Sequence, residues 1–316
     1  MPSTRYTKQI GFSLVELMVA MVLGLFLTGV VVSIFFSNTR TYATINVASL
    51  MQENGRFAVN EVASSLRRAG YLGGNNDVTT VSGGSAGSVT PGTTCNVGDS
   101  TWGRMIARRV FGLDDPSSGY GTCIGSGDVA NGDVLALRYI GQQPVTSYDA
   151  NRIYVRTSLF QGRVFKGTNQ ASTENLVSDT VQSTHSLIAN AFYIRNVTAD
   201  CASGSATVPS LFRMTLDGSG QPTAEELVRG VEDLQVQYGV DDDADGSVNQ
   251  YFDADNVTNW DLVQSVRFWV LIRAACQEHD LVNDNTYVLG DQTFTPTGDA
   301  RKFRRQLFSS IVMLRN

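Results

Sequence analysis

The sequence predicts an α+β fold in which one long N-terminal helix packs on an antiparallel β-sheet domain with large loops. Residues 12–36 form a strongly apolar segment with a single charged residue, Glu16. Residues 37–72 contain no proline and carry apolar side chains at helical spacing. From residue 134 onward, short segments alternate apolar and polar side chains, as half-buried strands do.

The apolar segment at residues 12–36 is long enough to cross a membrane, which takes about 20 apolar residues. Arg5 and Lys8 precede it, so residues 1–11 are expected to stay in the cytoplasm and the remainder to be exported. A cleaved signal peptide is one alternative, but residues 32–38 lack the small-x-small cleavage site it needs. A simple membrane anchor is another, and it leaves Glu16 unexplained.

Glu16 is the most informative residue of this segment. A carboxylate inside a membrane helix costs at least about 2.5–3.5 kcal/mol, so it usually has a partner and a function. An anchor or a signal peptide would gain nothing from such an acid. We therefore expect Glu16 to pair with a positive charge that the apolar helix itself does not supply.

The segment Gly11-Phe12-Ser13-Leu14-Val15-Glu16-Leu17 resembles the processing site of type IV prepilins and type II secretion pseudopilins. In those families a membrane-embedded prepilin peptidase cuts after the glycine and methylates the new amino terminus. The resemblance implies a leader at residues 1–11, cleavage between Gly11 and Phe12, and N-methylation of Phe12. It also implies that Glu16 pairs with the Phe12 amine of a neighbouring subunit.

A second resemblance is to the PilW family of minor pilins. It is carried by residues 51–58, 66–71, 238–246 and 304–316, whereas residues 73–200 match no motif. It implies a pilin-like fold and a role in assembling, initiating or capping a type IV pilus. The implied partners are the prepilin peptidase, other minor and major pilins and the inner-membrane assembly platform. The implied location is the inner membrane with a periplasmic C-terminal domain, and then the pilus.

The helix is predicted to continue beyond the membrane, over residues 12–70. Its apolar stripe consists of Ile45, Ala48, Met51, Ala58, Val62, Leu66 and Ala69. Arg67 and Arg68 followed by Gly70 form a C-terminal signal. Glycines at positions 24, 29 and 55 weaken the helix and mark either bends or close packing against neighbouring helices.

The globular domain is expected over residues 71–316. Residues 73–101 are rich in Gly, Ser, Thr and Asn and predict a loop or linker. Strands are predicted at residues 134–140, 152–157, 191–196, 211–216 and 264–274. Residues 303–314 fit either a last strand or a helix.

Four cysteines follow the apolar segment, and their even number in an oxidising compartment predicts two disulfides. Three connectivities are possible. We favour Cys95–Cys123 and Cys201–Cys276, because the first pair closes a single local loop region.

Asp241-x-Asp243-x-Asp245-Gly246 matches the opening of a calcium-binding loop, since hard cations bind several oxygens. Its twelfth position is Phe252 instead of the usual Glu, which makes an EF-hand improbable. Asn249 and Asp253 are further candidate ligands, and Asp255 lies just beyond them. An acidic surface turn without calcium explains the same residues.

No catalytic motif is present, and the two histidines, His185 and His279, have no acid or nucleophile pattern around them. The sequence therefore predicts a protein that is not an enzyme. The basic cluster Arg301, Lys302, Arg304 and Arg305 is the sole candidate for contact with nucleic acid or lipid. A net charge of −6 argues against a nucleic-acid partner, and a solvated strand face explains the cluster better.

Two function classes follow. The first is a structural assembly protein, either a minor pilin or a type II secretion pseudopilin with the same processing site. The second is a binding module, such as a tip adhesin or DNA-uptake receptor carried on a pilin helix. Binding of the exported domain to DNA or host surfaces would distinguish the second class from the first.

Overall fold

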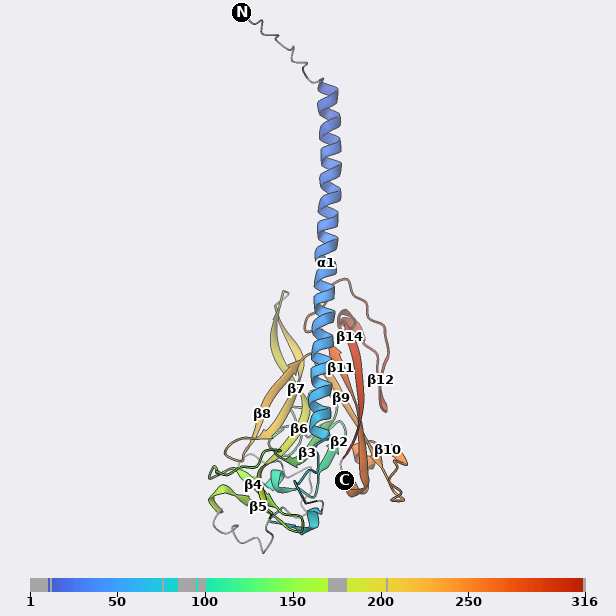
Figure 1. The fold of residues 1–316 in the computed structure, drawn as a ribbon. Coiled ribbons are helices and arrows are strands. Elements are labelled where there is room, and N and C mark those ends of the chain that lie inside the picture. Colours follow the sequence, from blue (N-terminus) through green and yellow to red (C-terminus); the bar gives the residue numbers. More distant parts are fainter. Residues whose placement is uncertain are drawn as a thin grey trace, which may run out of the picture. The chain divides into compact units, whose positions relative to one another are not determined.

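The computed structural model describes residues 11, 13–75, 77–84, 95, 101–169, 181–202 and 204–314. The fold is α+β, as predicted, with a long helix and three sheets (Figure 1). The chain divides into two compact units, Met1–Leu50 and Met51–Asn316. The helix α1 (Leu14–Leu66) contributes to both units, and each unit is described by itself.

The first unit contains α1 up to Leu50, and its apolar side chains are exposed on all sides of the helix. Within the described residues, α1 is the one helix long and apolar enough to cross a membrane. The hydroxyls of Thr28, Thr39 and Thr41 each donate to the backbone carbonyl four residues earlier, at 2.8–2.9 Å. These polar side chains are therefore satisfied within the helix, as an apolar environment requires.

In the second unit, α1 buries one stripe of mostly small or apolar residues. Its buried members are Met51, Gly55, Ala58, Val62, Ala63, Ser65 and Leu66. The predicted stripe is thus buried from Met51 onward, whereas Ile45 is exposed. The α-helix ends at Leu66, and two tighter turns follow before Gly70, whose φ of +78° is a conformation that glycine adopts most easily.

The buried stripe meets strands of two different sheets. Glu61 forms an ion pair of 2.5 Å with Arg213, and Asn54 donates to the backbone carbonyl of Arg229 at 3.0 Å. On another side, the ring of Phe308 occupies the space where a Cβ on Gly55 would lie. Close packing therefore explains Gly55, and α1 continues through this position as a regular helix.

The larger sheet has eight strands in the order β1-β5-β4-β6-β3-β2, with β7 paired to β6 and β8 paired to β7. It is antiparallel except where β1 runs parallel to β5. Its strands are β1 (Val81–Ser82), β2 (Val110–Leu113), β3 (Val134–Ile140), β4 (Ile153–Thr157), β5 (Gly162–Lys166), β6 (Ser183–Cys201), β7 (Gly204–Leu216) and β8 (Pro222–Arg229). The short helix η1 (Val78–Thr80) precedes β1, and α2 (Thr101–Arg104) lies between β1 and β2.

The second sheet is antiparallel, with the order β10-β9-β11-β14. Its strands are β9 (Val231–Val240), β10 (Gln250–Phe252), β11 (Val263–Arg273) and β14 (Arg305–Met313). The segment at residues 303–314 is thus mainly a strand, which resolves the two alternatives. A separate hairpin joins β12 (Tyr287–Leu289) to β13 (Gln292–Phe294), and the helices η4 (Ala254–Asn256), η5 (Trp260–Leu262) and η6 (Gly298–Lys302) connect these strands.

Two disulfides are present, with the pairing that the sequence analysis favoured. Cys95–Cys123 has a Cα–Cα distance of 5.6 Å, and Cys201–Cys276 one of 5.8 Å. The second bridge joins the end of β6 to the segment after β11, so it ties the two larger sheets together. Closing such long loops restricts the unfolded chain, which stabilises a fold by about 2–4 kcal/mol per bridge.

All five predicted strands occur, although two are parts of longer ones: residues 191–196 lie in β6, and residues 211–216 lie in β7. The predicted linker at residues 73–101 is partly described, and its described part contains η1 and β1. The rest of that linker, residues 76, 85–94 and 96–100, lies outside the described residues, as does Phe12.

The contact between Gly55 and Phe308 gives a test of this packing. Gly55→Ala improves helix propensity by about 1 kcal/mol, but its methyl group overlaps the Phe308 ring, and overpacking costs about 1–3 kcal/mol. We expect a net loss of about 1 kcal/mol in the free energy of unfolding of the full chain in detergent, measured by denaturant titration. In a Phe308→Ala background the same change should stabilise the protein. Equal effects in both backgrounds would contradict the proposed overlap.

Candidate functional site

The N-terminal end of α1 is organised by Ser13 and Glu16. The Ser13 hydroxyl accepts the backbone N–H of Glu16 at 3.3 Å, and the Ser13 carbonyl accepts the N–H of Leu17 at 3.2 Å. Ser13 is therefore the N-cap, and Glu16 occupies the third helical position, the spacing of a capping box. An acid in the first turn also interacts favourably with the helix dipole. The sequence analysis overlooked this capping role, which the Ser-x-x-Glu spacing indicates.

Capping leaves the charge of Glu16 without an opposite charge. No Lys, Arg or His among the described residues forms an ion pair with Glu16. Glu16 is exposed in the single chain. A Cβ placed on Gly11, just before the cap, would meet no atom within 4 Å apart from its chain neighbours, so a side chain would have open space there. Phe12, the expected amino-terminal residue after cleavage, lies outside the described residues.

The acidic loop connects β9 to β10 and brings three aspartates together. One carboxylate oxygen from each of Asp241, Asp243 and Asp245 lies within 4.8 Å of the other two. Asp241 is buried, with 2% of its surface exposed, whereas Asp243 and Asp245 are exposed. Positive φ angles at Ala244 (57°) and Gly246 (87°) turn the backbone around this cluster.

The other two candidate ligands each accept a hydrogen bond from another group of the chain. The Asn249 side-chain oxygen accepts the Asp242 N–H at 2.9 Å, so Asn249 closes the loop. Asp253 accepts a hydrogen bond of 2.6 Å from Gln237, a residue four positions before Asp241 on β9. At about 3.3 Å per strand residue, that position is about 13 Å from Asp241 along β9. The prediction of Asp253 as a ligand is therefore not supported by its position.

A second acidic cluster, Asp114, Asp115 and Asp133, lies where β2 and β3 approach β9. Asp133 is buried, and it accepts the backbone N–H groups of Asp115 at 3.1 Å and Val236 at 2.7 Å. Burial raises the pKa of Asp133 to about 8 against the effect of these hydrogen bonds. Burial therefore favours a proton on Asp133, and its two hydrogen bonds to backbone N–H groups join the segment before β3 to β9 of the other sheet.

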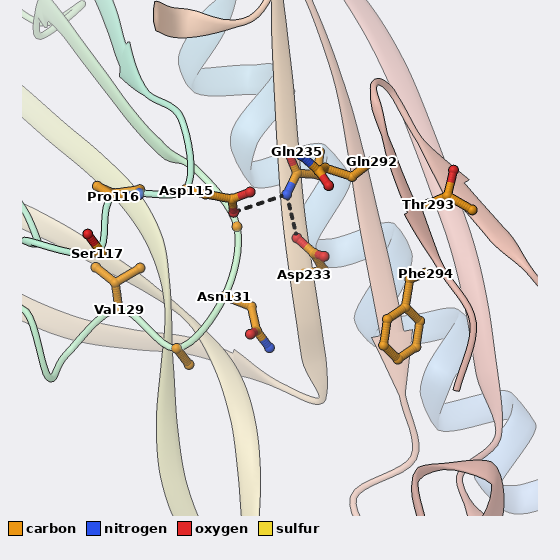
Figure 2. Close-up of a pocket in the computed structure, with 12 residues that line it drawn as sticks. Asp115, Pro116, Ser117, Val129, Asn131, Asp233, Gln235, Gln292, Thr293 and Phe294 are labelled. Atoms are coloured by element: carbon orange, nitrogen blue, oxygen red, sulfur yellow. Dashed lines mark hydrogen bonds between the residues drawn. The ribbon is translucent and has the colours of Figure 1, made fainter. Parts of the chain in front are cut away.

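The pocket beside this cluster is polar (Figure 2). The Gln235 side-chain amide donates to Asp233 at 3.1 Å and to Asp115 at 3.4 Å, and these three residues line one wall. Burial raises the pKa of Asp233 to about 6. Burial, followed by the neighbouring charge of Asp291, raises the pKa of Asp114 to about 6 as well.

The basic cluster near the C-terminus is neutralised by carboxylates of the same chain. Arg301 pairs with Asp284 at 2.5 Å and Lys302 pairs with Asp299 at 2.7 Å. Arg304 forms two hydrogen bonds, of 2.8 and 2.9 Å, with the carboxylate of Glu278. These pairs leave little unbalanced positive charge for phosphate groups. Together with the net negative charge of the chain, they argue against nucleic-acid binding.

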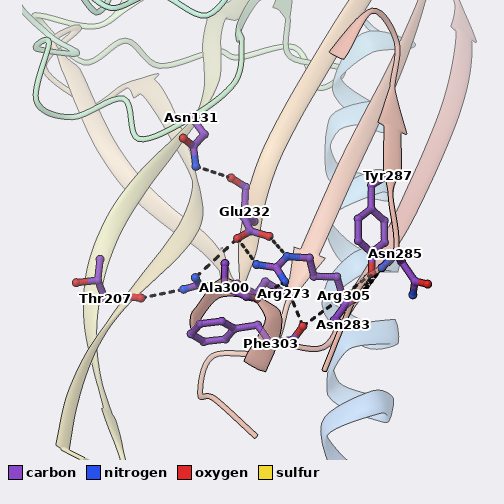
Figure 3. Close-up of polar contacts among 10 residues, drawn as sticks. All are labelled: Asn131, Thr207, Glu232, Arg273, Asn283, Asn285, Tyr287, Ala300, Phe303 and Arg305. Carbon is purple, nitrogen blue, oxygen red and sulfur yellow. Dashed lines mark hydrogen bonds and ion pairs between the residues drawn. The ribbon is translucent and has the colours of Figure 1, made fainter. Parts of the chain in front are cut away.

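Arg305, the fourth member, is not on a solvated face as the sequence analysis expected. Its guanidinium is fully buried and makes two hydrogen bonds to Glu232 of β9 across the intervening strand β11 (Figure 3). Arg273 lies 3.7 Å from the same carboxylate and donates to the backbone carbonyl of Thr207 in β7. The network thus connects the second sheet to the first.

Sequence reasoning missed both the central strand β9 and the buried acids that surround it. Leu234, Val236, Tyr238 and Val240 alternate with polar or small residues, so a period-two pattern was available. No comparable local signal identifies Asp133 or Glu232, because their partners come from distant segments.

Comparisons with known proteins identify two parts of the chain. Residues 191–316 match the family model of PilW, the type IV pilus-assembly protein W, and residues 6–32 match the prokaryotic N-terminal methylation motif. These matches confirm the resemblance to type IV prepilins and to PilW minor pilins, and neither model describes an enzyme. No curated protein and no solved structure matches the chain.

The raised pKa values of the buried acids predict a pH dependence of stability. An unfolded Asp has a pKa near 4, whereas the folded pKa of Asp133 is raised to about 8 by burial. The folded state therefore binds more protons over this interval, and the stability from Asp133 is complete below about pH 4 and lost as the pH rises through 8. We expect the melting temperature of the full chain in detergent to fall from pH 5 to pH 8.5.

Asp133→Asn should flatten this pH profile, because asparagine does not titrate, whatever its effect on the melting temperature itself. Asp299→Asn is the matched control, since Asp299 is exposed and its hydrogen bond to Lys302 lowers its pKa. A melting temperature that rises toward pH 8.5 would contradict the assignment, as would an unchanged slope in Asp133→Asn.

Proposed function

We propose that this chain is a minor pilin that enters a type IV pilus after leader cleavage and N-methylation, and that it helps to initiate or cap the pilus. The observation that carries the proposal is a methylation motif at residues 6–32 on the same chain as a PilW region at residues 191–316. The exposed apolar helix between Leu14 and Leu50 supplies the surface that anchors such a protein before assembly.

Processing would convert the N-terminus into the partner that Glu16 lacks. Cleavage by the prepilin peptidase between Gly11 and Phe12 removes Arg5 and Lys8 and creates a cationic amine on Phe12. This amine precedes Glu16 of its own chain by four residues, and in an assembly it can approach Glu16 of a neighbour. Opposite charges attract strongly in an apolar core, and each alone is costly there, so the pair favours ordered assembly.

The proposed location follows from the same segment. The positive leader keeps the N-terminus in the cytoplasm, and the unit Met51–Asn316 then lies in the periplasm, where its two disulfides persist. Other minor and major pilins and the assembly platform of the inner membrane are the proposed partners. The size of this unit favours the end of a filament, where it has fewer neighbours than in the shaft.

The pilus role is preferred to the alternatives for two reasons. A type II secretion pseudopilin shares the processing site, but the PilW match over residues 191–316 favours the pilus. A DNA-uptake receptor requires unbalanced positive charge, whereas Arg301, Lys302, Arg304 and Arg305 all pair with carboxylates.

The first test of this function is the mature N-terminus. Mass spectrometry of protein isolated from its native membrane should show a chain that begins at Phe12 and carries one added methyl group. The unprocessed form, beginning at Met1, should accumulate when the peptidase is absent. A mature terminus beyond Phe36 would instead indicate a cleaved signal peptide and would overturn the proposal.

The second test concerns Glu16. Glu16→Ala leaves the apolar helix intact, so processing and membrane insertion should proceed nearly as in the wild type. Incorporation into pili, measured by immunoblot of sheared filaments against the membrane fraction, should fall several-fold because the charge partner is lost. Glu53→Ala is the matched control, since it removes an exposed acid from the same helix outside the apolar segment. Normal incorporation of Glu16→Ala would remove the pairing argument.

A further inference from the structure

We propose that Asp241, Asp243 and Asp245 form a Ca²⁺ site that fixes the connection between β9 and β10. The proposal rests on the loop itself and does not depend on the pilus function. It begins from the proximity of the three carboxylates, of which one oxygen each lies within 4.8 Å of the others. Two oxygens bound to one Ca²⁺ ion at 2.3–2.6 Å can be at most about 5 Å apart, so the spacing fits a shared ion.

The second observation is an unsatisfied oxygen on the buried aspartate. Asp241 has 2% of its surface exposed, and its Oδ2 accepts the Gly246 N–H at 2.9 Å. Its Oδ1 is buried and has no hydrogen-bond partner in the part of the chain that the structure describes. A buried polar atom without a partner costs free energy, and more when its group is charged. A cation bound by this carboxylate would remove that cost.

One oxygen of each aspartate accepts a backbone N–H of the loop, which orients its carboxylate. Asp243 Oδ1 accepts the Asp245 N–H at 3.4 Å, and Asp245 Oδ1 accepts the Ser247 N–H at 2.7 Å. With the Asp241–Gly246 bond, all three carboxylates are oriented by backbone donors. Among the described residues, no basic side chain forms an ion pair with them, so their repulsion is not balanced by the protein.

The ligand set differs from the one that the sequence suggested. Asn249 positions the loop through Asp242, and Asp253 is held beside Gln237. Three carboxylate oxygens then need water and backbone carbonyls to reach the six to eight ligands of Ca²⁺. Such a partly hydrated surface site suits the affinity of extracellular modules, about 10⁻⁴–10⁻³ M, and not that of an intracellular sensor.

The ion would act on the strand pair that the loop closes. Asp241 donates its N–H to Leu262 just before β11, and Asn249 donates to Val240 at the end of β9. Fixing the loop therefore fixes the register of β10 on β9, where Gln250 faces Val240. Because the unfolded chain has no preformed site, binding stabilises the folded state by mass action.

The test uses the full chain in detergent, stripped with EDTA and dialysed into metal-free buffer. Millimolar CaCl₂ should raise the melting temperature by about 2–5 °C, and isothermal titration calorimetry should show one ion per chain. MgCl₂ should give a smaller rise, because Mg²⁺ requires a stricter octahedral geometry. Asp243→Ala with Asp245→Ala should abolish both the rise and the binding.

A gentler variant and a matched control keep the test decisive. Asp243→Asn with Asp245→Asn retains the side-chain oxygens that accept backbone N–H groups, so it should fold while the calcium rise is strongly reduced. Asp242→Asn removes an exposed charge from the same loop outside the cluster and should leave the rise unchanged. The proposal is overturned if calcium does not shift the wild type, if magnesium matches calcium, or if the Asn variant keeps the full rise.

Discussion

The structure depends on the two different apolar surfaces that one continuous helix must present. Up to Leu50, α1 exposes apolar side chains on every side, which suits a membrane or the interior of a filament. From Met51 to Leu66 the same helix buries one stripe, and small residues there let strands of both larger sheets approach closely. Glu61 pairs with β7 and Gly55 accommodates Phe308 of β14, which illustrates both contacts. Figure 1 shows this part of α1 between the labels of β7 and β14.

The two sheets are joined by hydrogen bonds and ion pairs between buried groups, and β9 contributes to several of them. Asp133 accepts the N–H of Val236 in β9, and the N–H of Asp133 itself donates to Leu234. Glu232 in the same strand pairs with the buried Arg305 and lies near Arg273 (Figure 3). Breaking such a pair on one side is destabilising because it leaves an uncompensated charge. The ion pairs of Glu232 with Arg305 and Arg273 lie within residues 191–316, the part of the chain that matches PilW, whereas Asp133 and Asn131, which donates to the Glu232 backbone carbonyl, lie outside it. The matched region therefore contains a buried ion pair of its own, and Asp133 from the preceding segment adds a further buried acid.

The elements that were predicted correctly are those whose pattern of apolar residues is visible within a short stretch of sequence. The membrane segment, the helical stripe and β11 each show their periodicity within a short window, so no distant contact was needed to recognise them. The strand β9 was missed although Leu234 to Val240 alternate, and Arg305 was wrongly expected on a solvated face because its partner Glu232 is distant in sequence. Asp253 was a candidate ligand by its spacing along the chain. The short strand β10 instead runs back along β9 and carries Asp253 toward Gln237, a consequence of strand pairing that residue spacing does not reveal.

Buried or membrane-embedded acids in this chain fall into two groups by how their charge is satisfied. Asp133 and Glu232 receive all their partners from the described chain, and their effect is to hold the two sheets together. Glu16 and Asp241 are oriented by the chain, through Ser13 and Gly246, yet among the described residues neither has a partner for its remaining charge. Where the rest of a fold satisfies its polar groups, a charge left without a partner is found mainly at functional sites. Such a charge is then satisfied by a group from outside the chain. The partner proposed for Glu16 is an amine in an apolar core, and the partner proposed for Asp241 is a hard cation in a turn of oxygen ligands. The two proposals differ because the surroundings of the two carboxylates differ, although their charge is the same.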